Sequence, residues 1–164
     1  MERTRGVSLA KGPVGIIGAV LLAGGILGLL MGSTDFTMDA PNGDVSGGTW
    51  LGIEGNGWTW LLFAGGGLLL LLSAPMHWSA KTMAMIVGLA MAAAAIISVV
   101  DGSDVLGIFA ANGMTMLAFG AAAVACLIVA MLPRVGKRKE VPADRDRRFE
   151  RDGRVEQRET STRA

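Results

Sequence analysis

Four long apolar stretches, separated by short polar segments, follow one another along this chain. The stretches cover residues 13–32, 57–74, 82–100 and 112–132, and none of them contains Asp, Glu, Lys, Arg or His. Because an α-helix rises about 1.5 Å per residue, about 20 apolar residues cross the roughly 30 Å hydrocarbon core of a bilayer. The pattern predicts an all-α membrane protein with four transmembrane helices. The second, stopped by Pro75, is the shortest.

The first stretch has a competing interpretation as a secretory signal peptide, because residues 1–12 form a basic lead-in. The apolar part of a signal peptide is only about 7–15 residues long and ends in an Ala-x-Ala-like cleavage site. The stretch from 13 to 32 fits neither criterion. We therefore expect residues 1–12 to be a cytoplasmic N-terminus and residues 13–133 to be a transmembrane domain.

A motif repeats in front of the second and fourth stretches. Leu51-Gly52-Ile53 leads to Asn56, and Leu106-Gly107-Ile108 leads to Asn112, with one residue inserted before the second Asn. A Thr follows three residues after each Asn. The first and third stretches also correspond, at an offset of 70 residues. The sequence predicts two tandem hairpin repeats that enter the membrane from the same side, a parallel repeat rather than an inverted one.

The polar residues of this motif are predicted to begin helices. Asn is a preferred N-cap, so Asn56 and Asn112 are expected to satisfy backbone donors at the start of the second and fourth helices. Thr59 and Thr115 are expected to hydrogen-bond back to their own helices. Two such helix starts brought together by pseudo-twofold symmetry form an alternative, outward-facing site for an anion or solute.

Small residues recur at every fourth position in three stretches, and such faces let helices approach closely in lipid. This pattern predicts helix packing, either inside the chain or between copies in an oligomer. The residues concerned are Gly24, Gly28, Gly32, Ala84, Gly88, Ala92, Ala118 and Ala122, followed in the fourth stretch by Cys126 and Ala130.

The charges predict the orientation of the spans. With four spans, both termini and the link around Lys81 lie on one side, and that side carries all 15 Lys and Arg residues. The opposite side carries acidic residues and no base. Under the positive-inside rule, both termini are cytoplasmic. The mixed charges of residues 134–164 predict a polar tail without a packed core, which is a candidate docking segment for a cytosolic protein.

Basic residues directly after the fourth stretch are candidates for contacts with lipid headgroups. They are Arg134, Lys137, Arg138 and Lys139. Near an anionic surface each base contributes about 1 kcal/mol. The alternative is that they are the ordinary positive flank of a last span.

Composition narrows the possible functions. One Cys and one His argue against a Cys- or His-based metal site, and the absence of Tyr leaves no stacking surface for nucleic acid. The outer loop offers oxygen ligands for a cation at Asp39, Asn42, Asp44 and Glu54, but it lacks the spacing of an EF-hand, so a solvated acidic loop is favoured over a cation site. Spans without ionisable residues argue against an ion-coupled transporter or an intramembrane enzyme, but they are compatible with a passive pore.

The arrangement of Gly-rich spans around the repeated Leu-Gly-Ile…Asn segment resembles a group of small four-span bacterial membrane proteins of unknown function. In that group His follows the Asn at the helix start, whereas Thr59 and Thr115 stand there in this chain. The resemblance supports the fold only, and it brings no activity. We expect the chain to lie in a bacterial plasma membrane.

The sequence favours a non-enzymatic accessory or structural component that acts through helix–helix contacts, without a cofactor or a metal. The alternative function is an oligomeric pore for a small solute or ion. The expected partners are the lipid bilayer, a second copy or another membrane protein, and a cytosolic protein at the tail, but not nucleic acid.

Overall fold

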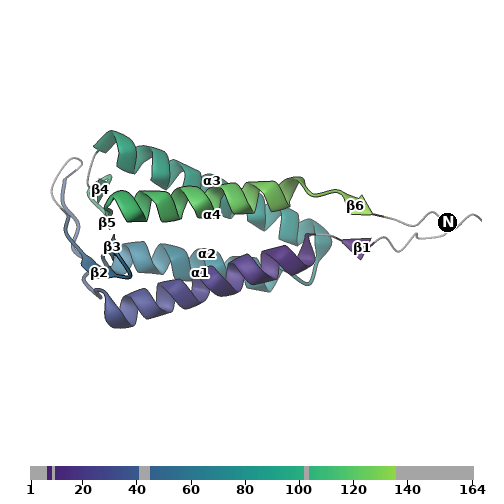
Figure 1. Cartoon of the computed structure of the whole chain (residues 1–164), viewed down its shortest axis with the longest axis horizontal. Helices are drawn as coiled ribbons and strands as arrows, with labels where there is room; N and C mark the ends of the chain where they lie inside the picture. Colours follow the sequence, from purple (N-terminus) through teal and green to yellow (C-terminus); the bar gives the residue numbers. More distant parts are fainter. Residues whose placement is uncertain (1–6, 9, 41–44, 102–103, 136–164) are drawn as a thin grey trace, which may run out of the picture. The chain divides into compact units, whose positions relative to one another are not determined.

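Each apolar stretch of the chain forms an α-helix in the computed structural model, which describes residues 7–8, 10–40, 45–101 and 104–135. The helices are α1 (Lys11–Met31), α2 (Gly57–Ser73), α3 (His77–Asp101) and α4 (Gly113–Met131) (Figure 1). Among the described residues, three helices are long and apolar enough to cross a membrane, namely α1, α4 and all of α3 after its first residue. Helix α2 is equally apolar but has only 17 residues.

The third helix begins earlier than the sequence predicts. Residues 76–81 were expected to link the second and third spans, but α3 already starts at His77, so the link shrinks to Ala74, Pro75 and Met76. His, Trp, Ser and Lys end an apolar stretch without disfavouring a helix, whereas Pro75 cannot continue α2. The limit of the apolar residues is therefore not the limit of the helix.

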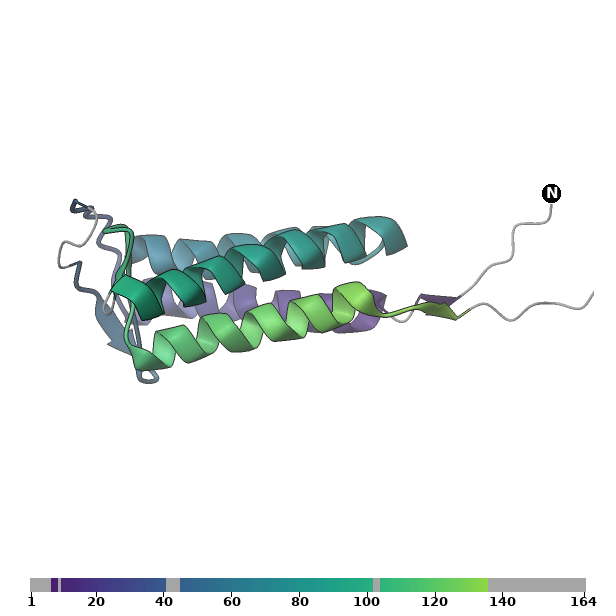
Figure 2. The same ribbon diagram turned by 90° about the horizontal axis from the view of Figure 1, so that it is seen from above.

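The helices pack as two pairs, α1 along α2 and α3 along α4 (Figures 1 and 2). On α1 the buried positions follow alternating steps of four and three residues, the 3.5-residue repeat of left-handed coiled-coil packing. They are Val14, Gly18, Leu21, Gly25 and Gly28. On α3 the same series is Ala80, Ala84, Val87, Met91, Ala94 and Ser98, with Gly88 also buried beside it.

Glycines bring the backbones of α1 and α2 into contact. A Cβ atom added to Gly25 would overlap the backbone of Ala64, and one added to Gly67 would overlap the backbone of Leu22. The indole ring of Trp60 lies where Gly28 would carry its Cβ atom. Such close approach supplies the van der Waals contacts that hold helices together in an apolar medium.

The sequence predicts that Gly24 packs against a neighbouring helix, and the structure contradicts this prediction. A Cβ atom there would meet nothing within 4 Å, so Gly25, not Gly24, makes the tight contact with α2. Each step of four residues turns a helix about 40° beyond a full circle, so a four-residue pattern drifts away from the neighbouring helix. A seven-residue pattern stays on it.

The other predicted small residues lie at or next to helix contacts. Gly32 lies against Trp60, and in the second pair a Cβ atom on Gly88 would lie 3.0 Å from the Cβ of Cys126. Ala84 and Ala122 are buried. Ala92 and Ala118 are half-buried and pack against the core.

A short antiparallel hairpin precedes the second helix of each pair. Strands β2 (Gly48–Trp50) and β3 (Ile53–Gly55) precede α2, and β4 (Asp104–Val105) and β5 (Phe109–Ala110) precede α4. The first turn has two residues, Leu51 and Gly52, both with positive φ. The second has three residues, 106–108, so the inserted residue lies in the turn. The Asn42-Gly43 pair in the outer loop also predicts a short hairpin, but it lies outside the described residues.

At the opposite end of the helices, strand β1 (Val7–Ser8) pairs antiparallel with β6 (Arg134–Val135). Val7 lies opposite Val135 and Ser8 opposite Arg134. This ladder joins the segment before α1 to the segment after α4. Apart from residues 134 and 135, the predicted tail lies outside the described residues.

Leu51 occupies a conformation that suits Gly or Asn. Its φ is 51°, and its side chain is 76% exposed. The left-handed region costs a Leu about 1–2 kcal/mol, whereas Asn tolerates it. We expect Leu51→Asn to stabilise the protein by about 1 kcal/mol in denaturant titration of the micelle-solubilised protein. Thr49→Asn, on an extended exposed residue of the same hairpin, is the control, and an equal effect would contradict this explanation.

Candidate functional site

The two repeats meet through the polar residues of the repeated motif. Asn56 caps α2, its side-chain oxygen accepting from the Thr59 N–H at 3.1 Å. Asn112 caps α4 in the same way, with 2.9 Å to the Thr115 N–H. In α4 the Thr115 hydroxyl also accepts from the Asn112 N–H, which completes a capping box.

The same side chains also bond across to the other repeat. The Asn56 amide donates to the carbonyl of Ile108 at 2.7 Å, and the Asn112 amide donates to the carbonyl of Gly52 at 3.0 Å. The two donors, Asn56 and Asn112, are 56 residues apart in the sequence, and so are the two acceptors, Gly52 and Ile108. The two bonds are therefore one contact made twice, around a pseudo-twofold axis.

The threonines repeat this reciprocity. The Thr59 hydroxyl lies 2.9 Å from the carbonyl oxygen of Ala110, and the Thr115 hydroxyl lies 2.6 Å from that of Glu54. Both hydroxyls were expected to bond only within their own helices. Each also lies 3.0 Å from its own Asn side-chain oxygen, but a hydroxyl has one proton, and the shorter contact is the one between repeats. Both Thr residues and Asn56 are fully buried.

Aromatic rings fill the bundle beside this junction. Phe63 of α2 stacks on Phe119 of α4, with ring centroids 5.0 Å apart, and these two residues are themselves repeat mates. Trp60 lies next to Phe63 and donates from its indole N–H to Gly55. The pseudo-twofold axis therefore runs through packed side chains.

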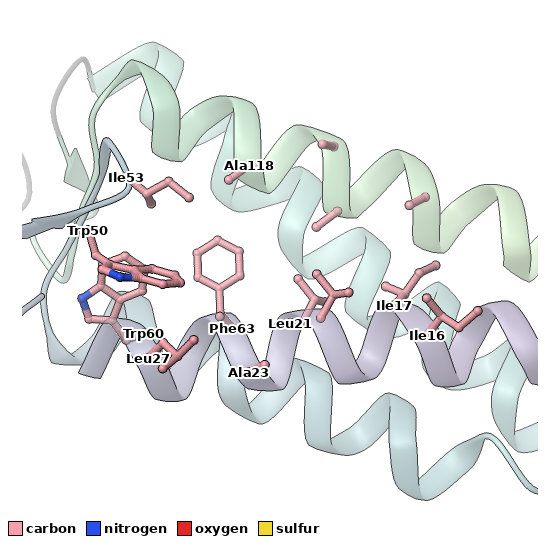
Figure 3. A pocket seen from close by; sticks show the side chains of 15 residues that line it. Ile16, Ile17, Leu21, Ala23, Leu27, Trp50, Ile53, Trp60, Phe63 and Ala118 are labelled. Carbon is pink, nitrogen blue, oxygen red and sulfur yellow. The ribbon is translucent and has the colours of Figure 1, made fainter. Parts of the chain in front are cut away.

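An apolar groove lies between α1 and α4 and has a volume of about 620 Å³ (Figure 3). Helix α1 contributes Ile16, Val20, Ala23, Gly24 and Leu27 among others, and α4 contributes Ala118, Ala121, Ala122 and Ala125. At the hairpin end, Trp50, Ile53, Trp60 and Phe63 line the groove. Gly24, predicted to pack on a helix, thus faces this groove.

A second, smaller groove of about 270 Å³ lies between α2 and α3. Nine residues line it, and all except Leu61 are repeat mates of residues in the first groove. For example, Ile86 corresponds to Ile16, and Gly65 corresponds to Ala121. The two grooves are therefore the same feature of the fold, formed twice between helices of different repeats.

The larger groove also reaches Trp50, Ile53, Trp60 and Phe63 at the hairpin end, and two shared positions differ in bulk between the grooves. Helix α4 has Ala118 and Ala125 in the first groove, whereas α2 has Leu62 and Leu69 at the corresponding places in the second. Each Leu side chain has three more carbon atoms than an Ala side chain, so it occupies space that remains open in the first groove. This difference between Ala and Leu is present in the sequence, and it becomes visible when the two repeats are aligned by their structure.

The remaining candidates are dispersed. Asp35 and Asp39 accept hydrogen bonds from nearby backbone N–H groups, and Glu54 accepts from Gly47. Among the described residues, no three His, Cys, Asp or Glu side chains gather as metal ligands would. Arg134 lies in β6, while Lys137, Arg138 and Lys139 are outside the described residues, as is Asp44.

Comparisons with protein-family models, with curated proteins and with solved structures give no match. A function can therefore be proposed only from the geometry of the described residues. The Asn–Thr junction joins the repeats, and the groove between α1 and α4 is the candidate binding site.

Proposed function

We propose that this protein is a non-enzymatic accessory component of a bacterial plasma membrane, with four spans and both termini in the cytoplasm. Three long apolar helices support the membrane location, and α2, about 25 Å long by its residue count, comes close to crossing the core. The positions of the basic residues support the orientation.

One observation carries the proposed mode of action, which is contact within the bilayer. Among the described residues, the buried polar side chains are committed to structure. The Asn and Thr residues of the junction bond to each other and across the repeats, while Ser73 and Ser98 donate to carbonyls of their own helices. The large α1/α4 groove has an apolar lining and so suits an apolar chain of the surrounding membrane.

The alternative function is an oligomeric pore, and nothing in the described residues favours a channel through a single copy of the chain. The stacked pair of Phe63 and Phe119 occupies the pseudo-twofold axis, and Leu70 and Met91 are fully buried. A pore would have to lie between copies.

A photoreactive residue in the α1/α4 groove tests this proposal. Incorporated at position 121 and irradiated in native membranes, it should give a discrete adduct that survives purification, and Ala118→Leu with Ala125→Leu should reduce that adduct several-fold. Its repeat mate, position 65 in the smaller groove, is the matched control. Equal adduct yields at the two positions, unchanged by the leucines, would refute the proposed binding site.

A further inference from the structure

Positive charge is concentrated at one end of the α1/α4 groove. Lys11, the first residue of α1, is exposed and lies five residues before Ile16, where the groove begins. Arg134 follows α4 directly, and the β1–β6 ladder places it opposite Ser8, close to the start of α1. Both bases thus come from segments continuous with the two helices that form the groove.

The opposite end of the groove has a different chemistry. It is closed by Trp50, Trp60 and Phe63 beneath the first hairpin, where Asp35 and Glu54 are the nearby charged residues along the chain. An anion would therefore be attracted to the Lys11 end and not to the hairpin end. A ligand with one negative end and one apolar chain matches both properties of the groove.

The dimensions restrict the apolar part of the ligand. From Ile16 to Leu27 the groove follows eleven residues of α1, about 16 Å along the helix. A transmembrane helix crosses the whole core of about 30 Å, so it would need a groove about twice as long. The lined part is centred on α1, so a chain whose head lies near Lys11 would extend about 24 Å, past the middle of the core, to reach Leu27.

The smaller α2/α3 groove lacks this combination. Lys11 corresponds to Lys81, but Arg134 corresponds to Trp78, and Leu62 and Leu69 occupy the smaller groove. The chain thus carries one open apolar groove, with Lys11 and Arg134 beyond its end in the sequence, and a filled copy of the same groove.

We propose that the α1/α4 groove binds one acyl chain of an anionic phospholipid, with its phosphate on the cytoplasmic side, at the end of the groove where Lys11 begins α1 and Arg134 follows α4. This inference rests on the proposed function and names the ligand of that same groove. An apolar wall holds the chain, and the two bases select the headgroup.

Native mass spectrometry of the purified full chain tests the proposal. The protein is equilibrated with equal amounts of phosphatidylglycerol and phosphatidylcholine that carry identical acyl chains. We expect one retained lipid per protein, with a preference of about tenfold for phosphatidylglycerol. Lys11→Gln with Arg134→Gln should reduce this preference to about twofold or less. Lys81→Gln, at the repeat mate of Lys11, is the matched control and should leave the preference unchanged.

Filling the groove tests the apolar part of the site. Ala118→Leu with Ala125→Leu introduces the residues that the other repeat already carries at these places, and it should reduce lipid retention about tenfold. Slow labelling of the buried Cys126 thiol verifies that the variant is folded. If it is not, the headgroup preference of the unaltered protein and of the charge variants still decides the question.

The outcomes separate the two proposals. Equal retention of both lipids by the unaltered protein, or full retention after the groove is filled, overturns the phospholipid site. If the adduct formed at position 121 is a protein and no lipid is retained, the phospholipid site fails but the accessory function stands. If neither an adduct nor a retained lipid is found, both proposals fail.

Discussion

Replacing Gly25 by Ala is expected to destabilise the protein by about 3 kcal/mol, near the upper end of the usual range for overpacking. The added methyl group would overlap backbone atoms of Ala64 and Trp60. Backbone atoms cannot rotate away as a side chain can, so α1 and α2 must move apart. The unique Cys126, which is fully buried, provides the measurement, because its thiol becomes reactive only when the bundle opens.

Gly24→Ala is the matched control for this prediction. It introduces the same methyl group one residue earlier, where nothing lies within 4 Å. We expect a change within about 0.5 kcal/mol, as for most substitutions that touch no special feature. Equal thiol-labelling rates in the two variants would contradict the assignment of Gly25 to the helix contact.

Replacing Asn56 by Ala is expected to cost about 3 kcal/mol. The cap itself contributes about 1 kcal/mol. The substitution also leaves the Ile108 carbonyl, on the other repeat, without its side-chain donor, and an unsatisfied group in a buried contact costs about 1–3 kcal/mol. The effect should be seen both in denaturant titration and in faster labelling of Cys126, which lies in the other repeat.

Asn112→Ala is the comparison for Asn56→Ala because the two residues are repeat mates. Asn112 makes the equivalent bond to Gly52, but it is only half-buried, and water can replace what is lost. We therefore expect roughly half the effect. A larger loss at Asn112 than at Asn56 would show that burial does not determine the strength of the junction.

The helices could be predicted from sequence because apolar length alone identifies them. The expected stretches 13–32, 57–74 and 112–132 lie within two residues of α1, α2 and α4. Asn56 and Asn112 lie at the predicted caps because capping depends on neighbouring residues. Local rules sufficed for both features.

Contacts between helices could not be predicted in the same way. In an apolar medium every face of a helix is apolar, so hydrophobic periodicity does not reveal which face is buried. Gly24 and Gly25 are therefore indistinguishable in the sequence, although only Gly25 contacts α2. Similarly, the partners of Thr59 and Thr115 lie more than 50 residues away and depend on how the repeats are paired.

The β1–β6 ladder has a topological consequence. The ladder holds Val7 opposite Val135, so the segment before α1 and the segment after α4 lie side by side. At the same end of the helices, α2 and α3 are joined by a link of only three residues. The four helices are thus connected in a ring that is open at one point. A circular permutant that joins residue 135 to residue 7 and opens the chain at Pro75 would order the helices as α3, α4, α1 and α2. In that permutant the groove would be formed by consecutive helices, α4 and α1.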